Sequence, residues 1–440
     1  MNNRKTSSPQ LFSGHQSDTI INAKRKNNSK VSEKEKSKDY LAITHISKYR
    51  KATYRSDGRY QVIVYRDGKK KTCYGKTSYK ANCAADIYES KDNSELYRIL
   101  TIPNYRYMFR YSFYRWRNYM LFYTSLEKSS VERYENTYNK YISGSCIDKM
   151  DIRKMGTKHL HEFFRVVLEE NEKISTKDYQ AIRHIIKGCI DFVYDYELDG
   201  DNDEEPSFDW DKVKRKIPKG KLYSRNKKER TVSKATKDEL SNNLTDNSND
   251  NYACKIMLLI NFSLGLRIGE LAALEVSDVD MVERLVYVHN NYKTECVRDE
   301  YGNRTGQRNH YSTHTKTPKG ERQIPISDSA YELFKKLFEY RKSNGITSKF
   351  LAYDGDKCKD RTKKLNTILN SWCNQSGVMK FNPHKIRKTF ASSLSKSPDI
   401  DIATISALLG HAQVSTTLDN YIVPEDEPVD EKIKKMSIYV

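Results

Sequence analysis

The sequence PHKIRKTF occupies residues 383–390 and contains two side chains that suit an anion. His384 and Arg387 lie three positions apart, so they share one face if the segment is helical. Two hydrogen-bond donors on one face suit a phosphate group, and a guanidinium can grip two phosphate oxygens at once. Taken alone, the segment also fits a basic helix that runs along a DNA backbone.

Two further segments carry residues of the same kind. LGLRIGEL at residues 264–271 follows a strongly apolar stretch and places Arg267 just after a glycine. A helix-capping arginine paired with Glu270 explains that segment as well. LLGH at residues 408–411 is followed ten residues later by Tyr421, which alone is unremarkable in a chain with 32 tyrosines.

In this order and spacing, the segments together resemble the tyrosine recombinase (phage integrase) family. The family pattern has an Arg in a G-x-R-x-x-E segment, a Lys on a β-hairpin, an H-x-x-R pair, a Leu-Gly-His segment, and a Tyr nine or ten residues further on. The resemblance covers nearly all of the last domain. It places the six catalytic positions on Arg267, Lys316, His384, Arg387, His411 and Tyr421.

The assignment of Lys316 depends on a hairpin that we predict over about 284–326. TKTPKGER at residues 315–322 leads into a predicted strand and resembles the catalytic-lysine hairpin of the family. Lys319 is the competing assignment. The segment 290–313 is long and polar, which departs from the family pattern and leaves the strand register of the hairpin open.

The resemblance implies a division of work around a DNA phosphodiester. Arg267 and Arg387 would hold the non-bridging oxygens of a transition state that carries added negative charge. His411 would hydrogen-bond the phosphate or help to hold that transition state. Glu270 is expected to orient its neighbours rather than to react.

The remaining three positions would move the phosphoryl group and the protons. Tyr421 is the nucleophile, and because a phenol has a pKa of about 10 it needs a base, for which His384 is the candidate. Lys316 would give a proton to the leaving 5′-oxygen. The phosphotyrosine bond conserves the energy of the broken bond, so we expect no cofactor, no nucleotide and no metal ion. The sequence shows neither a carboxylate cluster for two-metal catalysis nor a Gly-rich phosphate loop.

The chain of 440 residues is long enough for several domains, and we expect a multidomain fold. It comprises a small α+β domain with a three-stranded sheet, an all-α core-binding domain, and a mixed α/β catalytic domain that is mainly helical with a small antiparallel sheet. The predicted boundaries are a flexible basic arm at 1–45, an arm-type DNA-binding domain at 46–99, the helical core-binding domain at 100–200, a linker at 201–229, and the catalytic domain with its C-terminal tail at 230–440.

The α+β domain is predicted from turn signals and alternation. Asp-Gly pairs at 57–58 and 67–68 bracket a good strand at 60–66, and a third strand follows at 70–76. A helix at about 78–97 would cover one face of the sheet. With Lys and Arg pointing outward, such a sheet can enter a major groove, and it resembles the arm-binding domain of lambda-type integrases. A generic small α+β domain is the alternative.

The middle of the chain is predicted to be helical. Residues 100–124 interleave aromatic and basic side chains, which suits stacking on nucleic acid or an amphipathic connector helix equally. Apolar residues then recur at three and four positions over 127–198, which indicates four or five helices. Residues 199–229 begin acidic and turn basic, as expected of a solvated linker.

Composition agrees with a partner that is a polyanion. The chain carries 78 Lys and Arg against 58 Asp and Glu, a net charge of +20, and residues 1–100 hold 22 basic and 10 acidic residues of these totals. No apolar stretch is long enough for a membrane span, and the N-terminal residues are polar. None of the eight cysteines forms a C-x-x-C pair, so we expect reduced thiols in a cytoplasmic protein of the bacterial nucleoid.

The resulting interpretation is a site-specific recombinase that cuts and rejoins DNA through a 3′-phosphotyrosyl intermediate and integrates and excises a mobile element. It resembles the integrases of Gram-positive conjugative transposons and phages. The expected partners are double-stranded DNA at core and arm attachment sites, three further copies in a homotetramer, and an excisionase or host DNA-bending protein. Residues 422–440 could dock on a neighbouring copy or pack on their own domain. The alternatives are a type IB-like topoisomerase, a non-catalytic DNA-binding regulator, and a basic structural or RNA-binding protein.

Overall fold

The computed structural model describes residues 45–198, 205–223, 231–244, 251–314, 320–353 and 359–420. The chain divides into two compact units. Unit 1 takes its residues from 1–225 and 297–306, and unit 2 takes them from 226–296 and 307–440. Within the described ranges, no helix combines the length and the apolar character that crossing a membrane requires.

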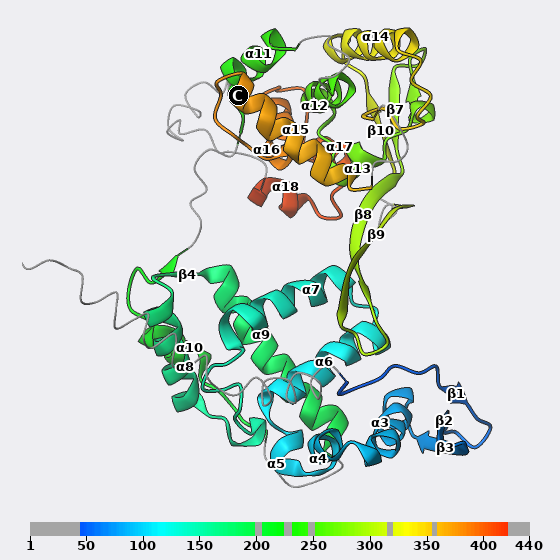
Figure 1. The fold of residues 1–440 in the computed structure, drawn as a ribbon. Coiled ribbons are helices and arrows are strands. Elements are labelled where there is room, and N and C mark those ends of the chain that lie inside the picture. Colours follow the sequence, from blue (N-terminus) through cyan, green and yellow to red (C-terminus); the bar gives the residue numbers. More distant parts are fainter. Residues whose placement is uncertain are drawn as a thin grey trace, which may run out of the picture. The chain divides into compact units, whose positions relative to one another are not determined.

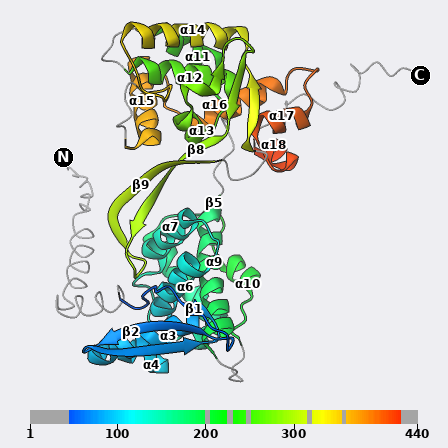
Figure 2. The same cartoon turned by 90° about the vertical axis from the view of Figure 1, so that its right-hand side faces the viewer.

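Unit 1 contains a three-stranded antiparallel sheet in the order β1-β2-β3, whose strands are labelled in Figure 1 and whose long strand β2 is seen lengthwise in Figure 2. Its elements are β1 (Thr53–Tyr54), β2 (Tyr60–Arg66), β3 (Lys69–Gly75) and the helix α3 (Ser78–Glu89). Asp67 and Gly68 form the β2–β3 turn with φ angles of +49° and +73°, as a tight hairpin requires. Val62 and Val64 are buried in a small core with alanines of α3, so the helix covers one face of the sheet.

The predicted helix over 78–97 is two helices rather than one. After α3 comes a 3-10 turn, η2 (Ser90–Asp92), and then α4 (Ser94–Thr101). Asn93 lies between them in an extended conformation, and its side chain accepts a hydrogen bond of 3.1 Å from the backbone N–H of Leu96. An asparagine that caps a new helix in this way ends the preceding one.

The rest of unit 1 is a bundle of helices, as predicted. They are α5 (Pro103–Arg106), α6 (Phe109–Tyr123), α7 (Lys128–Thr137), the π-turn η3 (Tyr138–Ile142), the 3-10 turn η4 (Ile152–Lys154), α8 (Thr157–Glu170), α9 (Thr176–Phe192) and the π-turn η5 (Val193–Glu197). The apolar positions with helical spacing, such as Leu160 and Ile182, are fully buried in one core.

The aromatic and basic residues of α6 face inward. Arg115 and Trp116 are only 2% and 6% exposed. The Arg115 guanidinium donates to both carboxylate oxygens of Glu197, with nitrogen–oxygen distances of 2.7 and 2.9 Å. The same carboxylate accepts from the Tyr79 hydroxyl at 2.7 Å, which ties α3 to the bundle. For these residues the interpretation as a surface that stacks on nucleic acid is wrong, because their partners are a buried carboxylate and the core.

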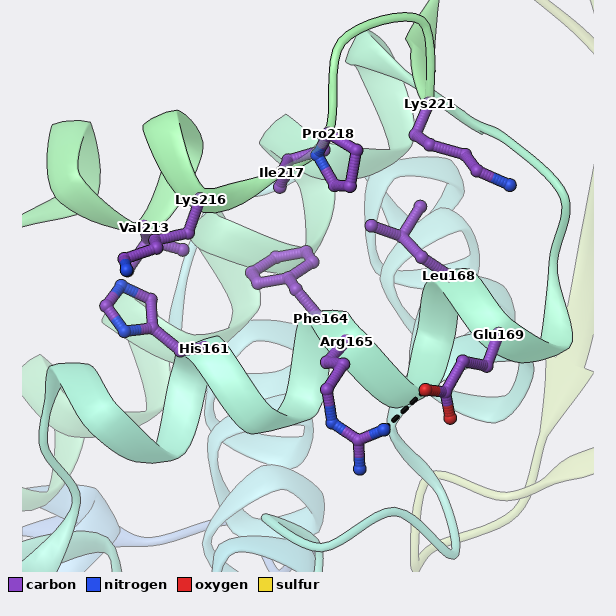
Figure 3. Close-up of a pocket in the computed structure, with 10 residues that line it drawn as sticks. All are labelled: His161, Phe164, Arg165, Leu168, Glu169, Val213, Lys216, Ile217, Pro218 and Lys221. Atoms are coloured by element: carbon purple, nitrogen blue, oxygen red, sulfur yellow. Dashed lines mark hydrogen bonds and ion pairs between the residues drawn. The ribbon is translucent and has the colours of Figure 1, made fainter.

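The segment predicted as a linker contains an ordered helix. α10 (Trp210–Lys216) is capped by Asp209, whose carboxylate accepts from the backbone N–H of Lys212 at 2.8 Å. Val213 is 1% exposed and belongs to the core of the bundle. α10 and the residues after it line a cavity of about 440 Å³ against α8 (Figure 3). A two-residue strand, β5 (Leu222–Tyr223), pairs in parallel with β4 (Ile174–Ser175). A few apolar side chains, chiefly Val213 and Ile217, therefore anchor a mainly charged segment.

Unit 2 is mainly helical with a small sheet, as predicted (Figure 1). Its helices and turns are α11 (Lys234–Asn242), α12 (Tyr252–Leu264), α13 (Ile268–Ala273), η6 (Val276–Asp278), α14 (Asp328–Ser343), α15 (Arg361–Gln375), α16 (Pro383–Leu394), α17 (Ile402–Leu409) and α18 (Val414–Asn420). Its strands are β6 (Val279–Asp280), β7 (Leu285–Val288), β8 (Asn290–Arg298), β9 (Arg304–His314) and β10 (Arg322–Pro325). α12 is mainly apolar and buried along nearly its whole length, because α14, α15 and α16 pack around it.

The predicted hairpin is built from two separate pairings. β10 pairs antiparallel with β7, with Ile324 opposite Val286, and β6 completes a sheet in the order β10-β7-β6. β8 and β9 form a two-stranded ribbon of their own. The tip of that ribbon, Val297–Gly306, belongs to unit 1. The long polar segment 290–313 is thus an ordered ribbon.

The ribbon tip is held in unit 1 by a buried carboxylate. Glu135 of α7 accepts two hydrogen bonds of 2.8 Å from the guanidinium of Arg298 and one of 2.8 Å from Nε of Arg304. Arg117 of α6 donates to the same carboxylate at 3.4 Å and to the backbone oxygen of Tyr301 at 2.7 Å. Burial acts to raise the pKa of Glu135, but these arginines outweigh it and lower the pKa. The carboxylate therefore remains charged and binds the tip.

Candidate active site

The first site residue, Arg267, is delivered by a tight turn at the end of α12. Gly265 has a φ of +63°, and a Cβ atom there would lie 2.2 Å from a ring carbon of Phe390. Only glycine fits such a position. Two residues later the chain enters α13, with Arg267 as its N-cap residue. The Arg267 side chain is 41% exposed, which leaves it accessible to a ligand.

Glu270, one turn into α13, is the buried carboxylate of the site. It accepts from the backbone N–H of Arg267 at 2.9 Å, from the Arg267 guanidinium at 2.8 Å, and from Arg322 at 2.8 Å. Nη1 of Arg387 lies 3.9 Å from it. Burial acts to raise the pKa of Glu270, but the positive charges of Arg322, Arg267 and Arg387 lower it to about 2. A carboxylate held so firmly in its ionised form orients arginines and does not act as a base, which agrees with the expectation from the sequence.

His384 and Arg387 lie on α16, whose first turn is fixed by its N-cap. Asn382 accepts from the backbone N–H of Lys385 at 3.1 Å, and Pro383 occupies the first helical position. The predicted helix is present, but its two functional side chains lie in different surroundings. His384 is exposed, whereas Arg387 is 0% exposed.

Arg387 is bonded on several sides by protein atoms. Its Nη1 donates to the backbone oxygen of Gly265 at 2.8 Å. Its Nη2 donates to the backbone oxygen of Leu409 and lies 3.0 Å from Nε2 of His411. The arginine therefore joins the end of α12 to the end of α17, and its position is set by both.

His411 has a defined protonation state. A guanidinium can only donate, so Nε2 of His411 accepts from Arg387, and Nδ1 carries the proton and donates to the hydroxyl of Thr417 at 2.8 Å. Burial and the charges of Arg387, Arg267 and Arg322 lower the pKa of His411 to about 4. His411 is consequently a neutral imidazole at physiological pH. Thr417 is fully buried in α18 and fixes this tautomer.

His384 is also held in its neutral form. Desolvation and the charges of Lys388, Arg387 and Arg267 lower the pKa of His384 below its ordinary value of 6.5. Because the ring is exposed and uncharged near neutral pH, it can accept a proton from a group that approaches from solvent. The arrangement as a whole combines two arginines and a neutral histidine beside an accessible base.

The comparison with known proteins identifies this domain. The model of the phage integrase family matches residues 233–427. This domain belongs to the phage integrase family. Residues 233–427 thus form a tyrosine recombinase domain, the kind of domain that breaks and rejoins DNA, as the residue pattern predicts.

Relatives and solved structures of tyrosine recombinases agree with this. A "Tyrosine recombinase XerC-like" protein of Caldanaerobacter subterraneus subsp. tengcongensis is 24% identical over 391 residues, which cover 84% of this chain and 93% of the relative. The "Transposase from transposon Tn916" of Enterococcus faecalis is 29% identical over 182 residues, which cover 37% of this chain and 40% of the transposase. The structure of the Tn1549 transposon integrase in complex with transposon right end DNA matches 74% of this chain and 99% of its own, with a TM-score of 0.52 and 17% identity.

The recombinase brings four of the six proposed catalytic positions into one region of unit 2, namely Arg267, His384, Arg387 and His411. The other two proposed positions, Lys316 and Tyr421, lie outside the described residues. So do the competing Lys319 and the tail at 422–440. Two residues that bond to the site, Arg322 and Thr417, are not singled out by the sequence pattern. Arg322 ends the segment that carries Lys316, but its partner Glu270 is 52 positions away. Thr417 follows the Leu-Gly-His segment, and its role depends on which tautomer His411 adopts.

The neutral state of His411 predicts an acid sensitivity of unit 2. The folded-state pKa of about 4 is below the ordinary 6.5, so between these pH values the unfolded chain binds a proton that the folded chain does not. The stability of unit 2 therefore falls as the pH drops from 6.5 to 4, by on the order of 3 kcal/mol from this residue, and is unaffected by it above pH 6.5.

Hydrogen exchange of the buried α12 amides as a function of pH measures this effect. His411→Gln should flatten the dependence between pH 6.5 and 4, while His310→Gln on β9 of the same unit should leave it in place. An unchanged slope in His411→Gln would contradict the assignment.

Proposed function

We propose that this tyrosine recombinase cleaves DNA by attack of Tyr421 on a phosphodiester, and that it integrates and excises a mobile element through the resulting 3′-phosphotyrosyl bond. The observation that carries the proposal is the convergence of Arg267, Arg387 and His411 around one ionised carboxylate. A single carboxylate beside several arginines leaves an excess of positive charge, which suits a phosphate that gains negative charge in its transition state.

The two proposed phosphate-binding arginines differ in what they need to bind a phosphate. Arg267 is partly exposed and can turn its fork toward a phosphate while its backbone N–H stays bonded to Glu270. Arg387 is enclosed, so its contact with a phosphate requires that the imidazole of His411 gives way or shares the oxygen. Each donor of this kind is typically worth about 3 kcal/mol of transition-state stabilisation.

The direction of each proton transfer follows from the protonation states of the site residues. The phenol of Tyr421 loses its proton to neutral His384 as its oxygen bonds to phosphorus. The bond from phosphorus to the 5′-oxygen breaks, and Lys316 protonates the leaving oxygen. Attack of a 5′-hydroxyl on the phosphotyrosine reverses these steps and releases the tyrosine, so strand exchange needs no external energy.

The N-terminal sheet is proposed to bind the arm sites. Its open face presents Ile63, Tyr65 and Tyr74, which are 44%, 66% and 41% exposed. Lys70 pairs with Tyr65 across the strands, so positive charge and apolar surface share this face. Weaker binding of arm DNA by Tyr65→Ala, with unchanged binding of core DNA, is the expected result. If Tyr65→Ala binds both arm DNA and core DNA as tightly as wild type does, this role is contradicted.

The remaining partners are those of a recombination complex. We place four copies of the chain on two core duplexes in a homotetramer at the bacterial nucleoid, with an excisionase and a host bending protein setting direction. The likeness to the Tn916 transposase supports a mobile element as the substrate. A type IB-like topoisomerase is disfavoured, because relaxation of DNA needs no second set of sites.

A covalent-trapping assay tests the nucleophile. The protein is incubated with nicked duplexes from the ends of its own element, so that cleavage releases a short fragment and cannot reverse, and the products are run on a denaturing gel without added metal ions. Wild type and the control Tyr97→Phe, an exposed tyrosine of α4, should form a slow-migrating adduct. Tyr421→Phe should form none.

Each other outcome of this assay has a defined meaning. An adduct in Tyr421→Phe would assign the nucleophile to another tyrosine. Tight DNA binding without any adduct in wild type would favour the non-catalytic regulator.

A further inference from the structure

Three consecutive backbone carbonyls at the end of α17 accept hydrogen bonds from three different arginines. The Leu408 oxygen accepts from Nε of Arg322 at 2.6 Å. The Leu409 oxygen accepts from Arg387, and the Gly410 oxygen accepts from Nη2 of Arg267 at 3.1 Å. The last carbonyls of a helix have no partner within the helix and carry its negative dipole end, so arginines are well suited to them.

The same three arginines share one carboxylate. Glu270 lies 2.8 Å from Arg267, 2.8 Å from Arg322 and 3.9 Å from Arg387. Each arginine thus bridges α13 to the segment that carries His411. Two of the three are the proposed phosphate-binding residues, and the third is the first residue of β10.

All three guanidinium nitrogens of Arg322 bond protein atoms, and its side chain is far less exposed than that of Arg267. Nε bonds the Leu408 oxygen, Nη1 lies 3.1 Å from the Gly320 oxygen and 3.3 Å from Glu270, and Nη2 bonds Glu270 at 2.8 Å. Its side chain is 6% exposed, against 41% for Arg267. This geometry suits an arginine that holds other groups in place and does not itself touch DNA.

We propose that Arg322 is a positioning residue, which neutralises Glu270 and fixes the Leu408–His411 segment so that Arg267 and Arg387 stay available to the scissile phosphate. The proposal rests on the phosphate-binding roles given above to Arg267 and Arg387. Without Arg322, the charge of Glu270 is shared by those two residues alone. Arg267, the accessible one, is then held more tightly by the carboxylate and less by a phosphate.

Substitution of Arg322 by lysine separates the effect of its positive charge from the effect of its planar guanidinium. Arg322→Lys keeps the positive charge, but an ammonium is a point charge and cannot span the Leu408 carbonyl and both oxygens of Glu270 as a planar fork does. We expect the adduct to form 10- to 100-fold more slowly under single-turnover conditions, with the affinity for core DNA and the melting temperature close to those of wild type. Arg284→Lys, which alters an exposed ion pair with Asp328 in the same unit, is the matched control and should react at the wild-type rate.

A double-mutant cycle shows whether Arg322 acts through Glu270. If it does, Glu270→Gln and Arg322→Lys together should slow cleavage by less than the product of their separate effects. The proposal would be overturned if the double variant were slowed by the full product of the two single effects. A wild-type cleavage rate in Arg322→Lys would also overturn it. A lowered melting temperature with a cleavage rate that recovers fully on cooling would also overturn it, since this indicates a structural role alone.

The same experiment distinguishes this inference from the proposed function. No adduct in wild type contradicts the nucleophile assignment, whatever Arg322 does. A normal adduct in wild type with unaltered kinetics in Arg322→Lys contradicts only the positioning role. Should Arg322→Lys not fold, Arg322→Gln keeps one amide donor in place of the guanidinium and is measured in the same cycle.

Discussion

Arg387→Ala should lower the rate of covalent cleavage by about 10³-fold or more. Arg387 is 0% exposed and joins the Gly265 carbonyl, the Leu409 carbonyl and His411. Its removal takes away one proposed phosphate ligand and leaves the position of His411 undefined. Because both losses affect the transition state, the effect should exceed that of removing a single exposed donor.

Single-turnover trapping on the nicked substrate measures this effect. Lys396→Ala removes one exposed positive charge soon after the end of α16, and its rate should stay within about threefold of wild type once DNA is saturating. Arg387→Lys should fall between the two, since it keeps the charge without the fork. A folded Arg387→Ala protein that cleaves within tenfold of wild type would show that Arg387 has a structural role only.

The parts of the site that could be predicted from sequence are those carried by short local segments. The helix with His384 and Arg387 and the glycine before Arg267 each follow from a few adjacent residues. The β2–β3 hairpin likewise follows from the pair Asp67 and Gly68, whose positive φ angles its turn requires. In such segments a few adjacent residues determine the local conformation, so periodicity and turn chemistry are enough to predict it.

The parts that could not be predicted depend on which distant group a charged side chain meets. The aromatic and basic residues of α6 suited nucleic acid and a protein core equally, and only the fold shows that Arg115 bonds Glu197, 82 positions along the chain. Arg322 stood in a recognised segment, but its role depends on Glu270, which lies 52 positions away. A charge in a sequence therefore indicates that a counter-charge exists without saying where.

The charged linker illustrates a second limit of prediction from sequence, which is that a short helix can lack a recognisable apolar pattern. Residues 210–216 have two apolar side chains, Trp210 and Val213, among lysines, an arginine and an aspartate. Two apolar side chains in seven residues are too few to establish a period. Both nevertheless pack on the core of the bundle, Val213 against α8 (Figure 3). Tertiary packing, and not the local pattern, therefore determines that the segment forms a helix.

Glu135→Ala should destabilise unit 1 by about 3–5 kcal/mol, the second large effect that we expect. Glu135 is 6% exposed and bonds Arg298, Arg304 and Arg117. Without the carboxylate, three guanidinium groups remain close together and lose the anion that they share. Their repulsion and desolvation should loosen the ribbon tip at 297–306 against its remaining contacts, such as the ion pair of Lys48 with Glu300.

Hydrogen exchange of the tip and of α6 and α7 measures this release. In Glu135→Ala, amides of residues 297–306 should exchange at least tenfold faster, while those of α12 in unit 2 should be unaffected. Glu162→Gln, which alters an exposed ion pair with Arg165 on α8, should change neither. Faster exchange confined to α7, with the amides of the tip still protected, would contradict the role of Glu135 as the anchor of the tip. Restoring protection by Glu135→Asp, which keeps the charge on a shorter stem, would attribute the effect to the carboxylate itself.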